Sequence, residues 1–290
     1  MKLVVDGPNG AVPAYVYSGG KPFDPKLPCV VFIHGALHDH SVWTLLARWC
    51  AHHGYGALAL DLPGHGRSEG PPLASVQAHA DWLLALLAAA GVAQPGQATL
   101  VGHSMGSLIA LEAAARAPDR IHRLVMVGSA YPMKVSAALL DTARDAPLKA
   151  IDMVNAFSNS TLAAKPSYPG PGMWLHGGNR ALMRRVLNGP HVNGANGASG
   201  ANGPAGRCEV NLFHHDFSVC DRYDNGLAAA AQVTAPTTMI LGSVDQMTPP
   251  RAARELATAL KAHIVLLPSG HNLLAEAPDG VLDALRDALA

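Results

Sequence analysis

The segment from Thr99 to Leu111 reads TLVGHSMGSLIAL, and it joins an apolar run to an alanine-rich helical pattern. At the junction, residues 102–106 read GHSMG, which is the spacing G-x-S-x-G. Small residues two positions before and after the serine are needed where a strand turns sharply into a helix, because the two backbones approach closely there. The spacing therefore predicts that Ser104 lies on a strained turn, with its hydroxyl at the carboxyl edge of a sheet.

The composition restricts what such a serine can do. The chain has 290 residues, enough for one large domain, with 21 Lys and Arg against 21 Asp and Glu. Because this balance creates no field that would attract nucleic acid or an anionic membrane, neither is an expected partner. The opening residues MKLVVDGPNG contain no apolar signal region, and no apolar stretch is long enough to span a bilayer. Four scattered cysteines suit a reducing compartment, so a cytoplasmic location is expected.

Apolar runs alternate with amphipathic segments along most of the chain. A hairpin is expected over residues 2–17, where GPNG separates two short apolar stretches. Further strands are expected over residues 29–33, 55–61, 98–102, 124–127, 237–241 and 264–267. Helices are expected over residues 41–53, 75–90, 105–117, 250–262 and 282–289. This alternation predicts an α/β fold with a mostly parallel sheet that is covered by helices on both faces.

The alternation fails between residues 131 and 226. That part has helical pieces and a Gly/Asn-rich tract, which we expect to be a flexible loop over residues 188–206 because it has few apolar groups to offset its ordering entropy. We interpret 131–226 as a mainly helical cap inserted into a core domain made of residues 1–130 and 227–290.

A serine is a poor nucleophile near neutral pH unless an imidazole takes its proton and an acid orients that imidazole. His271 follows the strand pattern HIVLLPSG, so its ring can reach the carboxyl edge of the sheet. Asp245 follows the strand expected over residues 237–241, in MILGSVDQMTPP. The strand before it, expected over 124–127, is in the segment LVMVGSAYP, which contains no acid. Ser104, Asp245 and His271 are therefore the candidate catalytic residues, in the chain order Ser, Asp, His.

Taken together, these stretches resemble the serine hydrolases of the α/β-hydrolase superfamily. The resemblance covers nearly the whole chain, through VVFIHGALHDHSVW, LALDLPGHGRS, LVGHSMGS, ILGSVDQMTP and LLPSGHNLLAEAP. It implies an oxyanion hole in which the Met105 amide is joined by the amide of Ala36, with Leu37 as an alternative in the same loop. It also argues against a dehalogenase or an epoxide hydrolase, which use an aspartate nucleophile, since Ser104 occupies the nucleophile position.

Other residues are candidates for contact with substrate. We expect substrate contacts from Leu37, His103, Met133, Trp174 and His214. For His103, which neighbours the nucleophile, packing against the sheet is the commoner role. Several cap residues (Met133, Met153, Phe157, Met173 and Trp174) could form either an apolar acyl pocket or the cap's own core. The set Cys208, His214, His215 and Cys220 suggests zinc, but it lacks the short Cys-x-x-Cys pair typical of such sites, so no metal is expected.

The sequence therefore predicts a serine hydrolase that cleaves a carboxylic ester of small to medium size through an acyl-enzyme, without a metal or organic cofactor. The expected partner is a small-molecule ester, and a homodimer is left open. Alternatives on the same three residues are a carbon–carbon bond hydrolase, a thioesterase, an amidase or aminopeptidase, and a cofactor-free perhydrolase. An alternative of another class is a noncatalytic ligand-binding protein with this fold.

Overall fold

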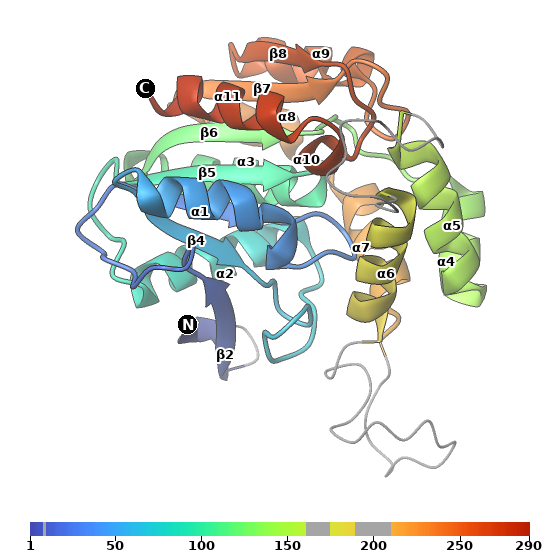
Figure 1. Ribbon diagram of the computed structural model, residues 1–290, viewed down its shortest axis with the longest axis horizontal. Helices are drawn as coiled ribbons and strands as arrows, with labels where there is room; N and C mark the ends of the chain where they lie inside the picture. Colours follow the sequence, from blue (N-terminus) through green and yellow to red (C-terminus); the bar gives the residue numbers. More distant parts are fainter. Residues whose placement is uncertain (8–9, 161–174, 189–209) are drawn as a thin grey trace.

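One eight-stranded sheet organises the protein. The computed structural model describes residues 1–7, 10–160, 175–188 and 210–290, and its strands follow the order β1-β2-β4-β3-β5-β6-β7-β8 (Figure 1). The strands are β1 (Lys2–Gly7), β2 (Gly10–Tyr17), β3 (Cys29–Ile33), β4 (Gly56–Leu60), β5 (Ala98–His103), β6 (Ile121–Val127), β7 (Thr237–Gly242) and β8 (His263–Leu267). The hairpin β1–β2 is antiparallel and joins β4 at one edge, and the strands from β4 to β8 run parallel.

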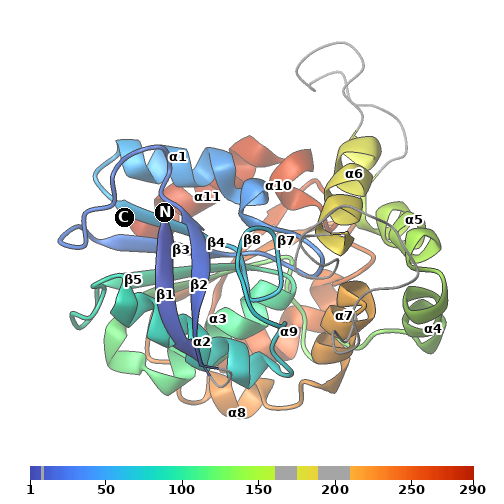
Figure 2. The ribbon, with the colours of Figure 1, turned by 90° about the horizontal axis from the view of Figure 1, so that it is seen from below.

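Helices cover both faces of the sheet, as Figure 2 shows. One face carries α2 (Val76–Ala89), α3 (Met105–Arg116), α8 (Gly226–Ala230) and α9 (Pro250–Ala259), and the other carries α1 (Thr44–His52), α10 (Leu273–Glu276) and α11 (Pro278–Leu289). Short 3-10 turns occupy His40–Trp43 and Pro118–Arg120. Every residue of β3, β4 and β5 is buried, because each of these central strands has a helix layer on both sides.

In the described part of the chain, four further helices lie between β6 and β7 in the sequence and beside the carboxyl ends of the parallel strands in space (Figure 1). These cap helices are α4 (Ala137–Asp145), α5 (Pro147–Ser158), α6 (Leu175–Leu187) and α7 (Leu212–Arg222). They share a small apolar core, which also contains Leu37 from the loop after β3. The cap therefore packs directly on a loop of the sheet domain. The segment expected to be flexible, 188–206, lies outside the described residues apart from Asn188.

The expected α/β architecture is confirmed, with differences at the ends of elements. The helix expected over 41–53 begins with a 3-10 turn at His40, and the Asp39 carboxylate caps this turn by accepting from the Ser41 amide. The helix expected over 250–262 ends at Ala259, and Lys261 then adopts a left-handed φ of 49°. Helices α5 and α7 were not predicted individually, since their apolar faces serve the cap core rather than the sheet.

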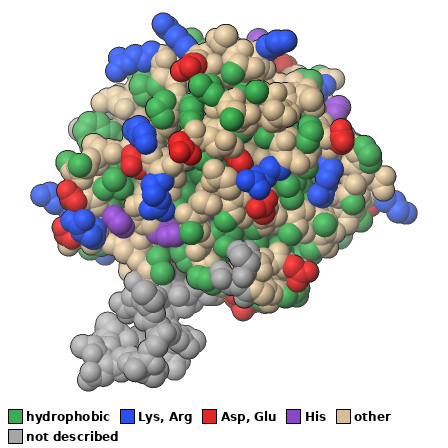
Figure 3. Space-filling model, turned by 180° about the vertical axis from the view of Figure 1, so that it is seen from behind, with side chains coloured by type: hydrophobic (Ala, Val, Ile, Leu, Met, Phe, Trp, Pro, Cys, Tyr) green, Lys and Arg blue, Asp and Glu red, His purple; other side chains and the backbone are tan. Residues whose placement is uncertain are grey.

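The surface has no strongly charged region on the face seen in Figure 3, where acidic and basic side chains are interspersed. This agrees with equal numbers of acidic and basic residues in the sequence. None of the described helices combines the length and apolarity that crossing a bilayer requires.

Candidate active site

Ser104 lies between β5 and α3, with a left-handed φ of 51° that a non-glycine residue rarely adopts. The flanking glycines explain how this turn forms. A Cβ on Gly102 would lie 2.2 Å from the Gly106 carbonyl oxygen, and a Cβ on Gly106 would lie 2.3 Å from that of Ile33. The Ser104 amide donates to the Val127 carbonyl at 2.9 Å, which ties the turn to the neighbouring strand.

Asp245 and His271 form a buried pair at the ends of β7 and β8. Nδ1 of His271 lies 2.8 Å from Oδ2 of Asp245. Burial alone would favour the neutral acid, but His271 and the hydrogen bonds from Thr248 outweigh it and lower the pKa of Asp245 to about 2. The carboxylate therefore stays ionised and accepts the Nδ1 proton, so Nε2 is the ring nitrogen left to receive a proton from elsewhere.

Thr248 is a component of this pair that the sequence reasoning missed. Its hydroxyl lies 2.7 Å from Oδ2 of Asp245 and 3.0 Å from Nδ1 of His271, and its amide donates to the other carboxylate oxygen at 2.8 Å. The signal in the sequence was the turn DQMTPP, where amides that follow an aspartate within three residues can bond its side chain.

Ser104 and His271 line one cavity of about 240 Å³ between the sheet edge and the cap. Thr248 also lines it. Much of the remaining wall is apolar and comes from the cap and the adjacent segments, with Met133, Leu139, Met153, Val154, Phe157, Met183, Phe217 and Met247. The structure thus brings Ser104 and His271 to the same apolar cavity, with His271 bonded to Asp245, although the three residues come from segments far apart in the chain.

The predicted substrate-contacting residues divide into three groups. Met133 and His103 line the cavity. Among the described residues, Leu37 and His214 do not: the Leu37 side chain is fully buried in the cap core, and His214 lies on α7. Trp174 lies outside the described residues.

His103 lines the cavity but is also held in place by contacts within the protein. Its Nε2 lies 3.0 Å from the His271 carbonyl oxygen, and the two rings pack at 4.9 Å between centroids. Burial, followed by the nearby His271, lowers the pKa of His103 well below its usual value. A neutral ring that donates from Nε2 supports the backbone of the His271 loop, and this favours the packing role over the binding role.

The loop after β3 brings Ala36 to the cavity. A Cβ on Gly35 would lie 3.1 Å from the Cβ of Ser104, so the loop runs directly against the candidate nucleophile. Ala36 lines the cavity, and Met105 is the first residue of α3, where backbone amides have no partner within the helix. The Leu37 amide donates instead to Oδ2 of Asp216 at 2.8 Å, so it is the less suitable of the two alternatives for an oxyanion.

His34 fixes the start of the same loop. Nδ1 of His34 lies 2.8 Å from the Gly35 carbonyl oxygen, while the Leu62 amide donates to Nε2 at 3.1 Å. Burial and the neighbouring His65 lower the pKa of His34 to about 3, so the ring is neutral and can make both bonds. These hydrogen bonds give His34 a structural role at the start of the loop.

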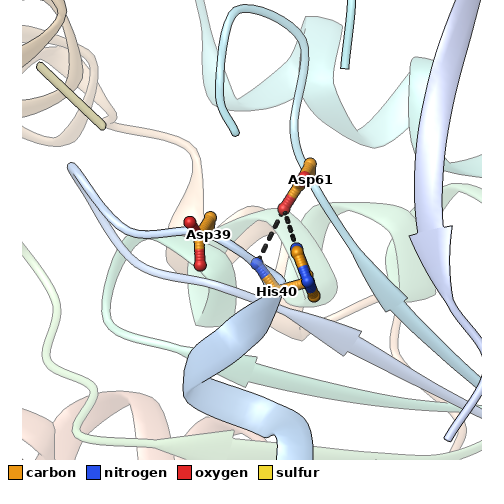
Figure 4. Close-up of side chains that lie close together, drawn as sticks. All are labelled: Asp39, His40 and Asp61. Carbon is orange, nitrogen blue, oxygen red and sulfur yellow. Dashed lines mark hydrogen bonds and ion pairs between the residues drawn. The ribbon is translucent and has the colours of Figure 1, made fainter. Parts of the chain in front are cut away.

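Asp39, His40 and Asp61 lie close together, with potential metal ligand atoms within 4.8 Å of one another (Figure 4). Hydrogen bonds account for the arrangement. Oδ1 of Asp61 accepts from the His40 amide and faces the His40 ring at 2.7 Å, and Oδ2 accepts from the Arg67 amide. The carboxylate of Asp39 is bonded to Ser41 and Arg185. Both acids therefore act as turn caps. Of the suggested zinc set, Cys208 lies outside the described residues.

Comparison with known proteins defines the family. The family described as "alpha/beta hydrolase fold" matches residues 28–278, which is most of the chain. The protein therefore belongs to the α/β-hydrolase fold family. A solved structure, the enol-lactonase from Burkholderia xenovorans LB400, has the same fold, with a TM-score of 0.76, 20% identity and 96% of both chains covered.

Curated relatives match over shorter stretches. The chain is 36% identical over 105 residues to the sn-1-specific diacylglycerol lipase ABHD11 of Mus musculus, covering 36% of this chain and 33% of the relative. It is 38% identical over 101 residues to the pimeloyl-acyl-carrier-protein methyl ester esterase of Methylococcus capsulatus, covering 34% of this chain and 36% of the relative. The matched stretch thus spans about a third of each relative's length.

Proposed function

We propose that the protein is a serine hydrolase that cleaves a carboxylic ester of small to medium size. The observation that carries this proposal is that His271, which is bonded to the buried Asp245, lines the same apolar cavity as the strained residue Ser104. The similarity to a lipase and to a methyl ester esterase supports it. The small-molecule partner is inferred from the size and apolar lining of the cavity. The cytoplasmic location and the homodimer stay predictions.

In this mechanism, Oγ of Ser104 attacks the ester carbonyl carbon while its proton passes to Nε2 of His271. Asp245 holds the ring through Nδ1 and stabilises the imidazolium that forms. The amides of Met105 and Ala36 donate to the oxyanion of the tetrahedral intermediate. Nε2 then returns the proton to the leaving alcohol as the carbon–oxygen bond breaks. A water molecule then attacks the acyl-enzyme while Nε2 of His271 takes one of its protons, and Nε2 gives that proton to Oγ of Ser104 as the acyl–oxygen bond breaks and the carboxylic acid leaves.

A fluorophosphonate probe and a series of p-nitrophenyl esters of increasing acyl length test this proposal. We expect the probe to form an adduct at Ser104 and the esters to be hydrolysed, and we expect both to be lost in Ser104→Ala. Ser107→Ala is the matched control, because Ser107 is a buried serine of the adjoining helix α3 whose hydroxyl bonds the Ser104 carbonyl oxygen and the Ser129 hydroxyl. It should retain the adduct.

The same test separates the alternatives. No adduct and no hydrolysis in folded protein would contradict an enzyme and support a noncatalytic binding protein. An adduct without ester turnover would direct attention to amide, thioester, carbon–carbon or peracid substrates on the same three residues, which are assayed beside the esters.

A further inference from the structure

Three successive residues of the loop after β3 each bond a different side chain of the cap helices. This loop, residues 34–39, begins at the end of β3 and contains Ala36, and we call it the oxyanion loop. The contacts are the Leu37 amide to Oδ2 of Asp216 at 2.8 Å, Nε2 of His38 to Oδ1 of Asn179 at 3.0 Å, and Oδ2 of Asp39 to Arg185 at 2.7 Å. The cap thus holds the segment next to Ala36 through side chains of α6 and α7.

The contact at Leu37 is the one that constrains the backbone. Leu37 has a left-handed φ of 54°, which costs a non-glycine residue about 1 kcal/mol and persists only where surrounding contacts enforce it. Here the enforcing contacts come from the cap, because the side chain is fully buried in the cap core and the amide is bonded to Asp216. Loss of the Asp216 acceptor would leave the buried Leu37 amide without this partner and let the chain relax.

Asp216 is itself fixed by a second buried residue of the sheet domain. Oδ2 also lies 2.9 Å from Nε2 of His65, and Nδ1 of His65 lies 3.1 Å from the Pro63 carbonyl oxygen. Both partners of the ring are acceptors, so both ring nitrogens must carry protons and His65 is an imidazolium. Burial opposes both charges, but their mutual attraction outweighs it and raises the pKa of His65 while lowering that of Asp216.

We propose that Asp216, which is itself held by His65, is a positioning residue. From the cap side, it holds the oxyanion loop so that the Ala36 amide can donate to the oxyanion. Leu37 follows Ala36 directly, and Gly35 on the other side lies against Ser104. A small rotation of the backbone at Leu37 therefore moves the Ala36 amide relative to the reacting carbonyl. This inference rests on the proposed function, because it needs ester turnover at Ser104. In this view the cap does more than enclose the substrate: one of its carboxylates holds part of the catalytic machinery.

The test compares Asp216→Ala with Asp216→Asn in the full chain, by ester kinetics. The alanine removes the acceptor, and kcat should fall about 10-fold to 100-fold while KM changes less than about twofold, since an oxyanion donor acts mainly in the transition state. The asparagine keeps one oxygen that can accept from Leu37, so kcat should stay within about threefold of the wild-type value. Amide hydrogen exchange over residues 35–38 should accelerate in the alanine variant only.

Glu112→Ala is the matched control for general destabilisation. Glu112 is also a buried carboxylate that accepts from Tyr223, Asn225 and Arg116, and it does not line the cavity. This variant should lower the melting temperature yet leave kcat unchanged. A folded Asp216→Ala protein with wild-type kcat would overturn the inference, and so would a loss of kcat in Asp216→Asn as large as in the alanine variant.

If Asp216→Ala does not fold, Asp216→Glu replaces it. This change keeps the negative charge near His65 but moves the carboxylate by one methylene, so kcat should fall below that of Asp216→Asn. The reverse order would show that charge rather than oxygen position matters, and it would overturn the inference. Wild-type protein that neither hydrolyses esters nor labels at Ser104 would instead contradict the proposed function, which is a separate result.

Discussion

The sheet edge and the cap contribute to the candidate site in different ways. At the sheet edge, backbone geometry places the groups: Ser104 sits on a glycine-flanked turn, and Asp245 and His271 follow adjacent parallel strands. At the cap, side chains from α6 and α7 reach across to a loop of the sheet domain. The positions of the reactive groups are therefore set by local backbone structure, whereas the position of the oxyanion loop is set by contacts between residues distant in sequence.

The largest expected effect is at the sheet edge. Asp245→Asn should lower kcat for ester hydrolysis by about 10⁴-fold, because an amide no longer stabilises the His271 tautomer that accepts a proton from Ser104. Steady-state kinetics measure it. Thr248→Val, which removes one hydrogen bond to the same carboxylate, should cost only about threefold to tenfold. An Asp245→Asn enzyme with more than a tenth of wild-type kcat would contradict the assigned role.

Two glycine substitutions, one at the sheet edge and one in the cap, should change the free energy of unfolding in opposite directions. Gly106→Ala places a Cβ 2.3 Å from the Ile33 carbonyl oxygen, so it should lower the free energy of unfolding by about 3 kcal/mol. Gly178→Ala, on cap helix α6, meets no atom within 4 Å and should raise it by about 0.5–1 kcal/mol. Urea unfolding measures both changes. A tolerated Gly106→Ala substitution would mean that the turn is less tightly packed than its geometry indicates.

Acid should destabilise the sheet domain through buried histidines. Burial, more than any other cause, lowers the pKa of His79 to about 4. Below pH 6.5 the unfolded chain binds a proton that folded His79 does not, so its stabilising contribution is present above that pH and is lost as the pH falls toward 4. His79→Leu should therefore reduce the loss of unfolding free energy between pH 7 and pH 5 by about 2 kcal/mol.

Unfolding curves at the two pH values measure this effect. The exposed residue His122 provides the control, and His122→Gln should keep the wild-type pH dependence. An unchanged slope in His79→Leu would show that another group causes the acid sensitivity. His65 has the opposite sign: its pKa is raised, so its contribution is present below pH 6.5 and is lost as the pH rises through the folded value.

The smallest expected effect belongs to the most exposed cap contact. The Arg185 side chain is 61% exposed where it pairs with Asp39, so solvent screens the pair. Arg185→Ala should change the free energy of unfolding at pH 7 by less than about 1 kcal/mol, as measured by urea unfolding. A loss of more than about 2 kcal/mol would mean that the ion pair anchors the cap to the oxyanion loop more firmly than its exposure indicates.

The sequence predicted the sheet domain well because its signals are local. Continuous apolar runs such as 29–33 mark buried strands, and G-x-S-x-G marks the turn at Ser104 from five neighbouring residues. Asp245 and His271 could be chosen because each follows such a run. That they lie close enough to form a hydrogen bond could be expected only because the carboxyl ends of parallel strands lie at the same edge of a sheet.

The cap could not be predicted to the same depth. The bond between Asp216 and the Leu37 amide joins residues 179 positions apart, and no periodicity or motif in the sequence connects them. The expected contact residues Leu37 and His214 do not line the cavity, because which face of a cap helix points inward depends on how the helices pack. The bond from the Thr248 amide to Asp245 is local, whereas the contact of its hydroxyl with His271 exists only because Asp245 and His271 lie side by side.

The order of the reactive groups along the chain determines when the site becomes complete during translation and what a proteolytic cut within the cap would separate. Ser104 precedes the cap helices, while Asp245 and His271 follow them, and β6 and β7 pair directly across that interval. A growing polypeptide therefore holds its nucleophile without a proton acceptor until residue 271 has been added. A protease that nicks the chain between α4 and α7 would divide the three groups between two fragments, and activity would survive only while the strands keep those fragments together.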